Sequence, residues 1–192
     1  MKKLIPLLVL VVAVTCSLNA QSPQIIFKNG GTTSYSLPFG SNASQKFQCF
    51  YPALSFPAAQ GSITRLYFRS SAAITGSVTY TNFIIKLGQT TSTNYPGAGN
   101  ADFFTGLTTV YSAASYTLVG ATTDYQWFYI DLQIPFAYVQ TSSNALVLEM
   151  QYSAKTGTGT QNIFGTATSP GTLSSTNVSA TSGTINTNRI NL

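Results

Sequence analysis

The side chains that could carry acid, base or nucleophilic chemistry are few in this chain. Histidine is absent, which removes Ser-His-Asp and Cys-His catalysis and the commonest nitrogen ligand of metals. The four carboxylates are Asp102, Asp124, Asp131 and Glu149. Asp131 and Glu149 form the best pair for glycoside hydrolysis, because both should face outward on strands that could be neighbours. Two solvated strand residues are the simpler interpretation. We therefore predict no catalytic residues and a protein that is not an enzyme.

Metal and thiol chemistry are not predicted either. Asp102 and Asp124 could contribute to a calcium site with loop carbonyls, but the closely spaced carboxylates that mark such sites are missing. Cys49 lies between Gln48 and Phe50 in an apolar segment, and we interpret it as a small buried hydrophobe. The sequence gives no reason to assign a metal or a cofactor.

Aromatic side chains are the better candidates for a binding site. The candidate ligand-binding residues, each predicted to point away from the core, are Trp127, Tyr129, Tyr67 and Tyr80. Exposed flat rings can stack on sugar faces, and exposed aromatic patches mark binding partners, so this set predicts polysaccharide binding. The alternative is structural, because cross-strand aromatic pairs stabilise a sheet by about 0.2–1 kcal/mol each.

Two segments with period-two alternation, 127–132 and 146–152, are predicted to form the centre of the fold. Their apolar positions, which should face a core, are Phe128, Ile130, Leu132, Leu146, Leu148, Met150 and Tyr152. Between the segments, Pro135 and the polar residues 141–144 are typical of a chain that leaves a sheet and re-enters it.

The rest of the chain has the same character, with turn residues at short intervals and few helix-forming windows. The predicted fold is all-β: a two-sheet antiparallel β-sandwich, jelly-roll-like, with about nine strands. The other predicted strands are 24–27, 44–51, 62–69, 78–87, 107–111, 116–119 and 161–164. Residues 90–100 are predicted to form a long loop, and the Ser/Thr-rich tract 169–187 an ordered loop or weak strands.

The amino-terminal residues predict export. Lys2 and Lys3 precede an apolar run over 4–14, and Ala20 ends a plausible cleavage site. We predict a signal peptide over 1–20 and a single β-sandwich domain over 21–192. The alternative is a lipoprotein signal acylated at Cys16, although Thr15 stands where such signals carry a smaller residue. The apolar run is shorter than the ~20 residues that span a bilayer, so we predict no membrane span.

The charge pattern argues against nucleic acid as a partner. Of nine basic residues, Lys2 and Lys3 leave with the signal peptide, and the remaining seven against four acidic residues give a net charge of +3. These seven form no run, whereas nucleic-acid binding needs clustered basic residues. Only 7% of residues are charged, so copies of the protein repel one another little. This composition favours self-association into a homo-oligomer or surface assembly.

Several separated motifs add a resemblance to a known module. Residues 61–68 read G-S-I-T-R-L-Y-F, which is similar to a "G-x-I-T-x-L-x-F" strand. Further motifs lie at 86–91, 110–111, 127–132, 135–138, 144–147 and 189–192. In this order they resemble a jelly-roll-like β-sandwich module found in secreted and cell-surface proteins of Bacteroidota, although the closing motif 189–192, R-I-N-L, lacks the family's proline. The resemblance implies an extracellular, mostly non-catalytic module and supplies no functional residues.

These observations lead to two functional hypotheses. The first is a secreted, non-catalytic adhesion or structural module that self-associates or associates with the cell surface. The alternative is a carbohydrate-binding module that uses the exposed aromatic residues, with polysaccharide as the partner. Both hypotheses expect no cofactor and an extracellular or cell-surface location.

Overall fold

The computed structural model of the protein describes residues 27, 33–40, 42–56 and 60–192. The predicted signal peptide, residues 1–20, and residues 24–26 of the first predicted strand lie outside this part. Among the described residues, no helix has the length and hydropathy needed to cross a membrane.

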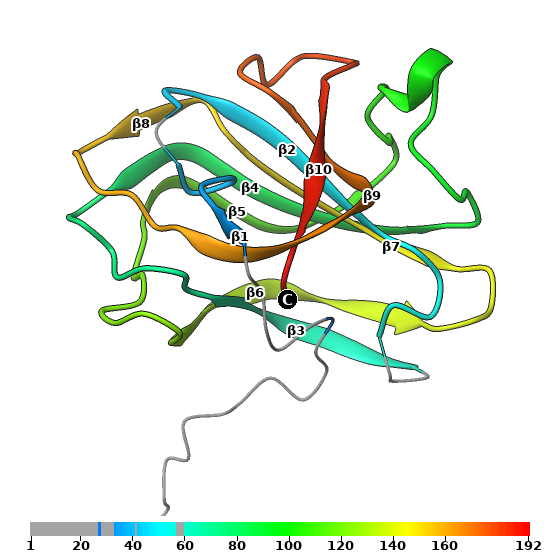
Figure 1. The fold of residues 1–192 in the computed structure, drawn as a ribbon, viewed down its shortest axis with the longest axis horizontal. Helices are drawn as coiled ribbons and strands as arrows, with labels where there is room; N and C mark the ends of the chain where they lie inside the picture. Colours follow the sequence, from blue (N-terminus) through cyan, green and yellow to red (C-terminus); the bar gives the residue numbers. More distant parts are fainter. Residues whose placement is uncertain (1–26, 28–32, 41, 57–59) are drawn as a thin grey trace, which may run out of the picture.

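The described residues form ten strands and one short 3-10 helix, η1 (Ala98–Asn100). The strands are β1 (Thr33–Tyr35), β2 (Gln45–Tyr51), β3 (Gln60–Arg69), β4 (Thr79–Thr90), β5 (Thr108–Thr117), β6 (Trp127–Val139), β7 (Ala145–Tyr152), β8 (Ala154–Thr156), β9 (Ile163–Ser175) and β10 (Thr184–Ile190). Each strand pair between them is antiparallel. The large sheet has the order β1-β9-β2-β7-β4-β5, and β3 pairs with β6 in a second, smaller sheet (Figure 1). The predicted all-β antiparallel sandwich is confirmed.

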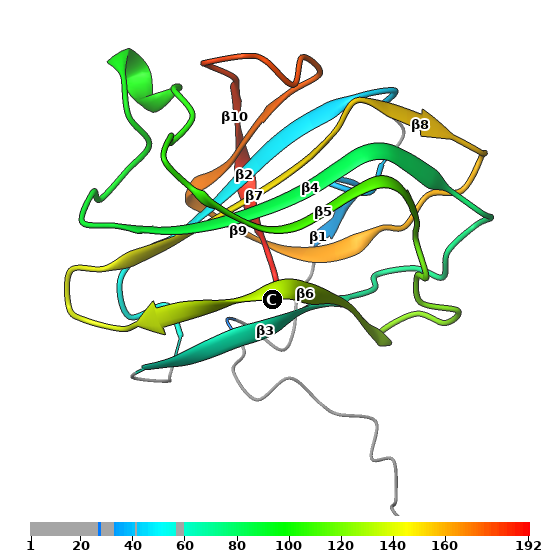
Figure 2. The same ribbon diagram turned by 180° about the vertical axis from the view of Figure 1, so that it is seen from behind.

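The strands are divided unequally between the two sheets of the sandwich. Strands β1, β9, β2, β7, β4 and β5 follow one another in the large sheet, where β10 also pairs with β9 and β8 with β4. An isolated bridge between Ser70, the residue after β3, and Ile163 of β9 links the large sheet to the small one. The long strand β9 has two successive partners within the large sheet, because residues 163–165 pair with β1 and residues 172–175 pair with β2. Pro170 lies between these two segments. A proline has no N–H to donate to a neighbouring strand, so it is tolerated where the pairing is interrupted. Figure 2, the view from behind, shows β3 and β6 side by side below the strands of the large sheet.

The main core fills the space between the small and the large sheet. Phe68 of β3 and Phe128 of β6 both pack on Phe39, with ring centroids 5.1 and 5.6 Å away. The predicted alternation holds here, because Phe128 and Ile130 are buried and Leu132 packs against the core. The apolar positions predicted in β7 are also buried, as is Cys49.

The outer face of the large sheet is covered as well. Residues 90–100 were predicted as a long loop, and the segment 91–107 places Tyr95 and Phe103 in a second apolar cluster with Phe50 and Val147. The Tyr95 hydroxyl donates hydrogen bonds to the carbonyls of Gln48 at 3.0 Å and Gly171 at 3.3 Å. Strand β7 is therefore buried on both faces, which explains its nearly continuous burial.

Several predicted strand boundaries are wrong. Strand β6 does not end before Pro135 but continues to Val139, because the register with β3 shifts between Ile63 and Arg65 and accommodates the proline. The two strands predicted over 107–111 and 116–119 are the single strand β5. It stays paired with β4 along its length, although the register shifts between Ile85 and Lys86. The tract 169–187 supplies half of β9 and the start of β10.

We expect the protein to lose stability in alkaline solution. Burial raises the pKa of the Cys49 thiol and of the Tyr35 and Tyr116 hydroxyls to about 12, from ordinary values of 9.0 and 10.0. The folded state keeps these groups protonated while the unfolded chain ionises, so their contribution is complete below pH 9 and falls above it. Urea unfolding followed by Trp127 fluorescence measures this dependence.

The variant Cys49→Ala serves as the control for this alkaline loss. Without the thiol, the decline in unfolding free energy should begin nearer pH 10, the ordinary value for tyrosine. An unfolding free energy that stays constant from neutral pH through pH 10 and above would contradict the assigned burial of these groups.

Candidate functional site

Six side chains form the outward surface of the small sheet, which we call the aromatic face. They are Arg65, Tyr67, Arg69, Trp127, Tyr129 and Asp131, and none of them belongs to the buried core. The register of β3 and β6 places them in three cross-strand pairs: Arg65 with Asp131, Tyr67 with Tyr129, and Arg69 with Trp127. Three of the four predicted aromatic residues are therefore brought together.

Arg65 fixes the centre of the aromatic face. Its guanidinium lies 4.0 Å from the Tyr129 ring centroid and 5.8 Å from that of Tyr67, and the two rings are 5.5 Å apart. Arg65 donates hydrogen bonds from Nε to the Asp131 carboxylate at 2.5 Å and from Nη1 to the Tyr67 hydroxyl at 3.2 Å. The bond to Asp131 raises the pKa of the guanidinium, which stays charged. The rings are thus held in place while Tyr129 remains 48% exposed.

Beside the Arg69–Trp127 end of the aromatic face lies Tyr125, an exposed ring that sequence reasoning missed. The Arg69 guanidinium lies 5.9 Å from the Trp127 ring and 5.8 Å from the Tyr125 ring, and Tyr125 is 62% exposed. Tyr125 packs on Phe164 at 5.2 Å and has a positive φ of 61°. Because it precedes β6 in a turn, strand alternation could not have identified it; an aromatic residue next to a predicted strand was the only signal.

Tyr80 does not belong to the aromatic face, and its predicted outward orientation is wrong. Its side chain is 0% exposed in the main core, and its hydroxyl donates a hydrogen bond to the Phe39 carbonyl at 3.2 Å. The cause is Asn82, whose φ of 52° interrupts the alternation of β4. As a result Tyr80 and Phe83, three residues apart, both face the core.

The two carboxylates considered for glycoside hydrolysis lie in different sheets and do not form a pair. Asp131 is on the aromatic face, whereas Glu149 of β7 is 2% exposed, so its predicted solvation is wrong. Residues 91–107 cover it, and it accepts hydrogen bonds of 2.7 Å from both Lys86 Nζ and Gln48 Nε2. Two carboxyls separated by the core cannot act on one glycosidic bond.

The described part of the chain holds no group of three His, Cys, Asp or Glu side chains that could bind a metal ion. The aromatic face is consequently the best candidate for a ligand-binding surface. It offers ring surfaces for stacking and, beside them, guanidinium, phenol and carboxylate groups for hydrogen bonds.

Comparison with protein-family models, with curated proteins and with solved structures gave no match to this chain. The resemblance to a Bacteroidota surface module therefore stays a prediction.

We expect Lys86→Met, at a half-buried position of β4, to destabilise the protein. The change removes the cation next to the buried Glu149 carboxylate, which keeps Gln48 as its remaining hydrogen-bond donor. Lys46 still interacts electrostatically with Glu149, so the buried carboxylate loses only part of its compensation, and the unfolding free energy should fall by about 1–3 kcal/mol, measured by urea denaturation. The double variant Lys86→Met/Glu149→Gln buries no charge and should recover most of the loss. Equal stability of the single variant and the natural protein would refute the importance of this pair.

Proposed function

We propose that the protein is a secreted, non-catalytic adhesion module that binds polysaccharide through the aromatic face. The observation that carries the proposal is the convergence of Trp127, Tyr129 and Tyr67 on one outward surface. The predicted signal peptide and the resemblance to an extracellular module of Bacteroidota support an extracellular or cell-surface location.

The chemistry of the aromatic face suits a saccharide chain. Aromatic rings contact the apolar C–H surfaces of sugars, and the neighbouring polar groups of Arg65, Tyr67 and Asp131 can exchange hydrogen bonds with sugar hydroxyls. Arg65 holds the Tyr67 ring by a hydrogen bond to its hydroxyl and lies over the Tyr129 ring, so both rings are positioned before a ligand arrives, which lowers the conformational entropy lost on binding. The competing explanation is that the rings only stabilise the two-stranded sheet, which would produce no ligand binding.

We expect Trp127→Ala and Tyr129→Ala to weaken polysaccharide binding by about tenfold or more, the usual effect of removing a central aromatic contact. Tyr129→Phe keeps the ring and should bind nearly as well as the natural protein. Binding of the purified protein to a polysaccharide array measures these effects. Leu54→Ala, an exposed apolar site after β2 that lines neither the aromatic face nor the polar groove, is the matched control.

Two results on the array would count against the proposal. The first is silence across all polysaccharides with the natural protein. The second is binding that survives Trp127→Ala and Tyr129→Ala while circular dichroism shows both variants to be folded. Either result leaves the aromatic rings with a purely structural role.

Self-association at the cell surface is a second proposal, and it is supported by the low content of charged residues, 7%. Because copies repel one another little, light scattering of the purified protein should show species larger than a monomer as the concentration rises. Added salt should change this distribution little, because few charges are available for screening. A monodisperse monomer at every concentration would exclude this mode of action.

A further inference from the structure

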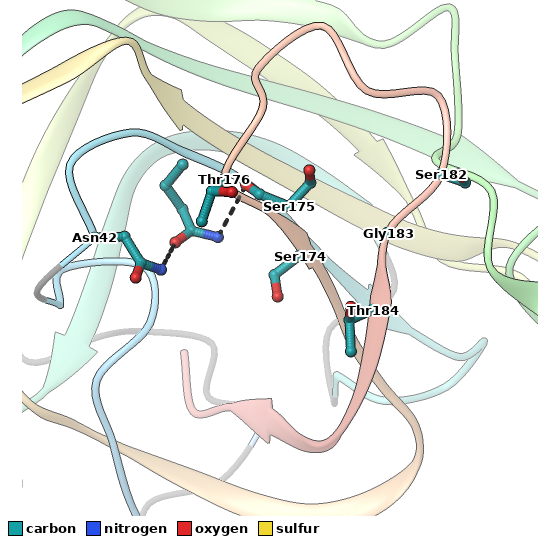
Figure 3. A pocket seen from close by; sticks show the side chains of 8 residues that line it. Asn42, Ser174, Ser175, Thr176, Ser182, Gly183 and Thr184 are labelled. Atoms are coloured by element: carbon teal, nitrogen blue, oxygen red, sulfur yellow. Dashed lines mark hydrogen bonds between the residues drawn. The ribbon is translucent and has the colours of Figure 1, made fainter.

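A groove away from β3 and β6 is lined by polar side chains and shares no residue with the aromatic face. It lies where the chain enters β2 and where β9 returns into β10, with a volume of about 410 Å³. Its lining residues are Asn42, Gln45, Ser174, Ser175, Thr176, Ser182, Gly183 and Thr184 (Figure 3). The lining thus consists of amides, hydroxyls and one glycine, without a charged or aromatic side chain.

The floor of the groove is fixed by hydrogen bonds from a buried amide. Gln45 is 1% exposed; its Oε1 accepts a hydrogen bond from Asn42 Nδ2, and its Nε2 donates to the Ser175 carbonyl at 3.4 Å (Figure 3). Ser174 Oγ accepts a hydrogen bond of 3.1 Å from Asn186 Nδ2. These bonds hold the polar groups of the floor in defined directions.

The opposite wall depends on the close approach of a glycine. A Cβ at Gly183 would lie 2.6 Å from the Ser174 carbonyl oxygen and 2.9 Å from the Phe103 ring, closer than packing allows. The Gly183 N–H donates to the Ala101 carbonyl at 2.9 Å, and the Phe103 N–H donates to the Thr181 carbonyl at 2.9 Å. The segment before β10 is therefore held against residues 101–103, and the groove stays open beside it.

The rim of the groove carries hydroxyls that are available to a ligand. Thr176, Ser182 and Thr184 are exposed, and their hydroxyls make no hydrogen bond to another residue in the part of the chain that the structure describes. The lining offers no opposite charge to an ionic ligand, and an apolar ligand would remove these hydroxyls from water without compensation. Both classes are therefore disfavoured.

We propose that this groove binds a neutral saccharide unit, independently of the aromatic face. Sugar hydroxyls both donate and accept hydrogen bonds, as do the side chains that line the groove. The volume also falls within the range of about 300–1,000 Å³ that is common for small-ligand sites. A polysaccharide-binding protein with two such sites would gain avidity for a long chain.

The test is a titration of the isotope-labelled full protein with neutral disaccharides (maltose, cellobiose, lactose and diacetylchitobiose), followed by nuclear magnetic resonance. At least one of them should shift the amide signals of residues 174–176 and 182–184. Glucuronate, an ionised sugar, should shift them less. The variant Thr184→Val removes one hydroxyl with little change in shape and should weaken binding about fivefold to tenfold. Thr109→Val, at an exposed site on β5, is the matched control and should have no effect.

The variant Trp127→Ala separates this inference from the proposed function, because it should leave the groove signals and their titration unchanged. The inference is overturned if no disaccharide shifts the groove signals, if glucuronate shifts them as strongly as the neutral sugars, or if Thr184→Val binds as well as the natural protein. Shifts confined to β3 and β6 would also overturn it while supporting the aromatic face.

Discussion

The packing of β3 and β6 onto the large sheet is the contact on which the candidate binding surface depends. A two-stranded sheet is marginally stable by itself in water. In this protein Phe68 and Phe128 anchor it, because both rings are buried and pack on Phe39. Since successive strand residues point to opposite sides, the burial of these two rings also sets the outward direction of Tyr67 and Tyr129. The core and the aromatic face are therefore two sides of one alternating pattern.

The sequence predicted this alternation well, since only side-chain polarity and spacing were needed. It predicted the fold class and strand β7, and it placed Trp127 and Tyr129 correctly on the outer side of β6. Tyr80 was misplaced because a single residue, Asn82, adopts a positive φ and shifts the alternation of β4. An asparagine tolerates this conformation better than most residues, but polarity alone does not reveal where it does so.

The burial of Glu149 could not be predicted from local sequence for a different reason. Its neighbours in β7 alternate as expected for a strand with one solvated face, yet residues 91–107 fold back over that face. The cover is held by hydrogen bonds between the Gln48 side chain and the backbone of Phe104, both 2.9 Å long. These contacts join residues 56 positions apart, which no short window of sequence contains. The polar groove was missed similarly, because it joins the entry of β2 to the β9–β10 connection.

The edges of the large sheet restrict how copies of the protein could associate. Strand β5 carries no charged residue, but its register with β4 shifts at Val110, and the Gln133 side chain occupies both backbone groups of Ser112. Strand β10 has a comparable register shift between Asn186 and Asn188. Such interruptions prevent continuous strand addition, since an incoming strand needs an unbroken row of N–H and C=O groups. The proposed self-association would therefore have to use side-chain surfaces rather than the backbone of β5 or β10.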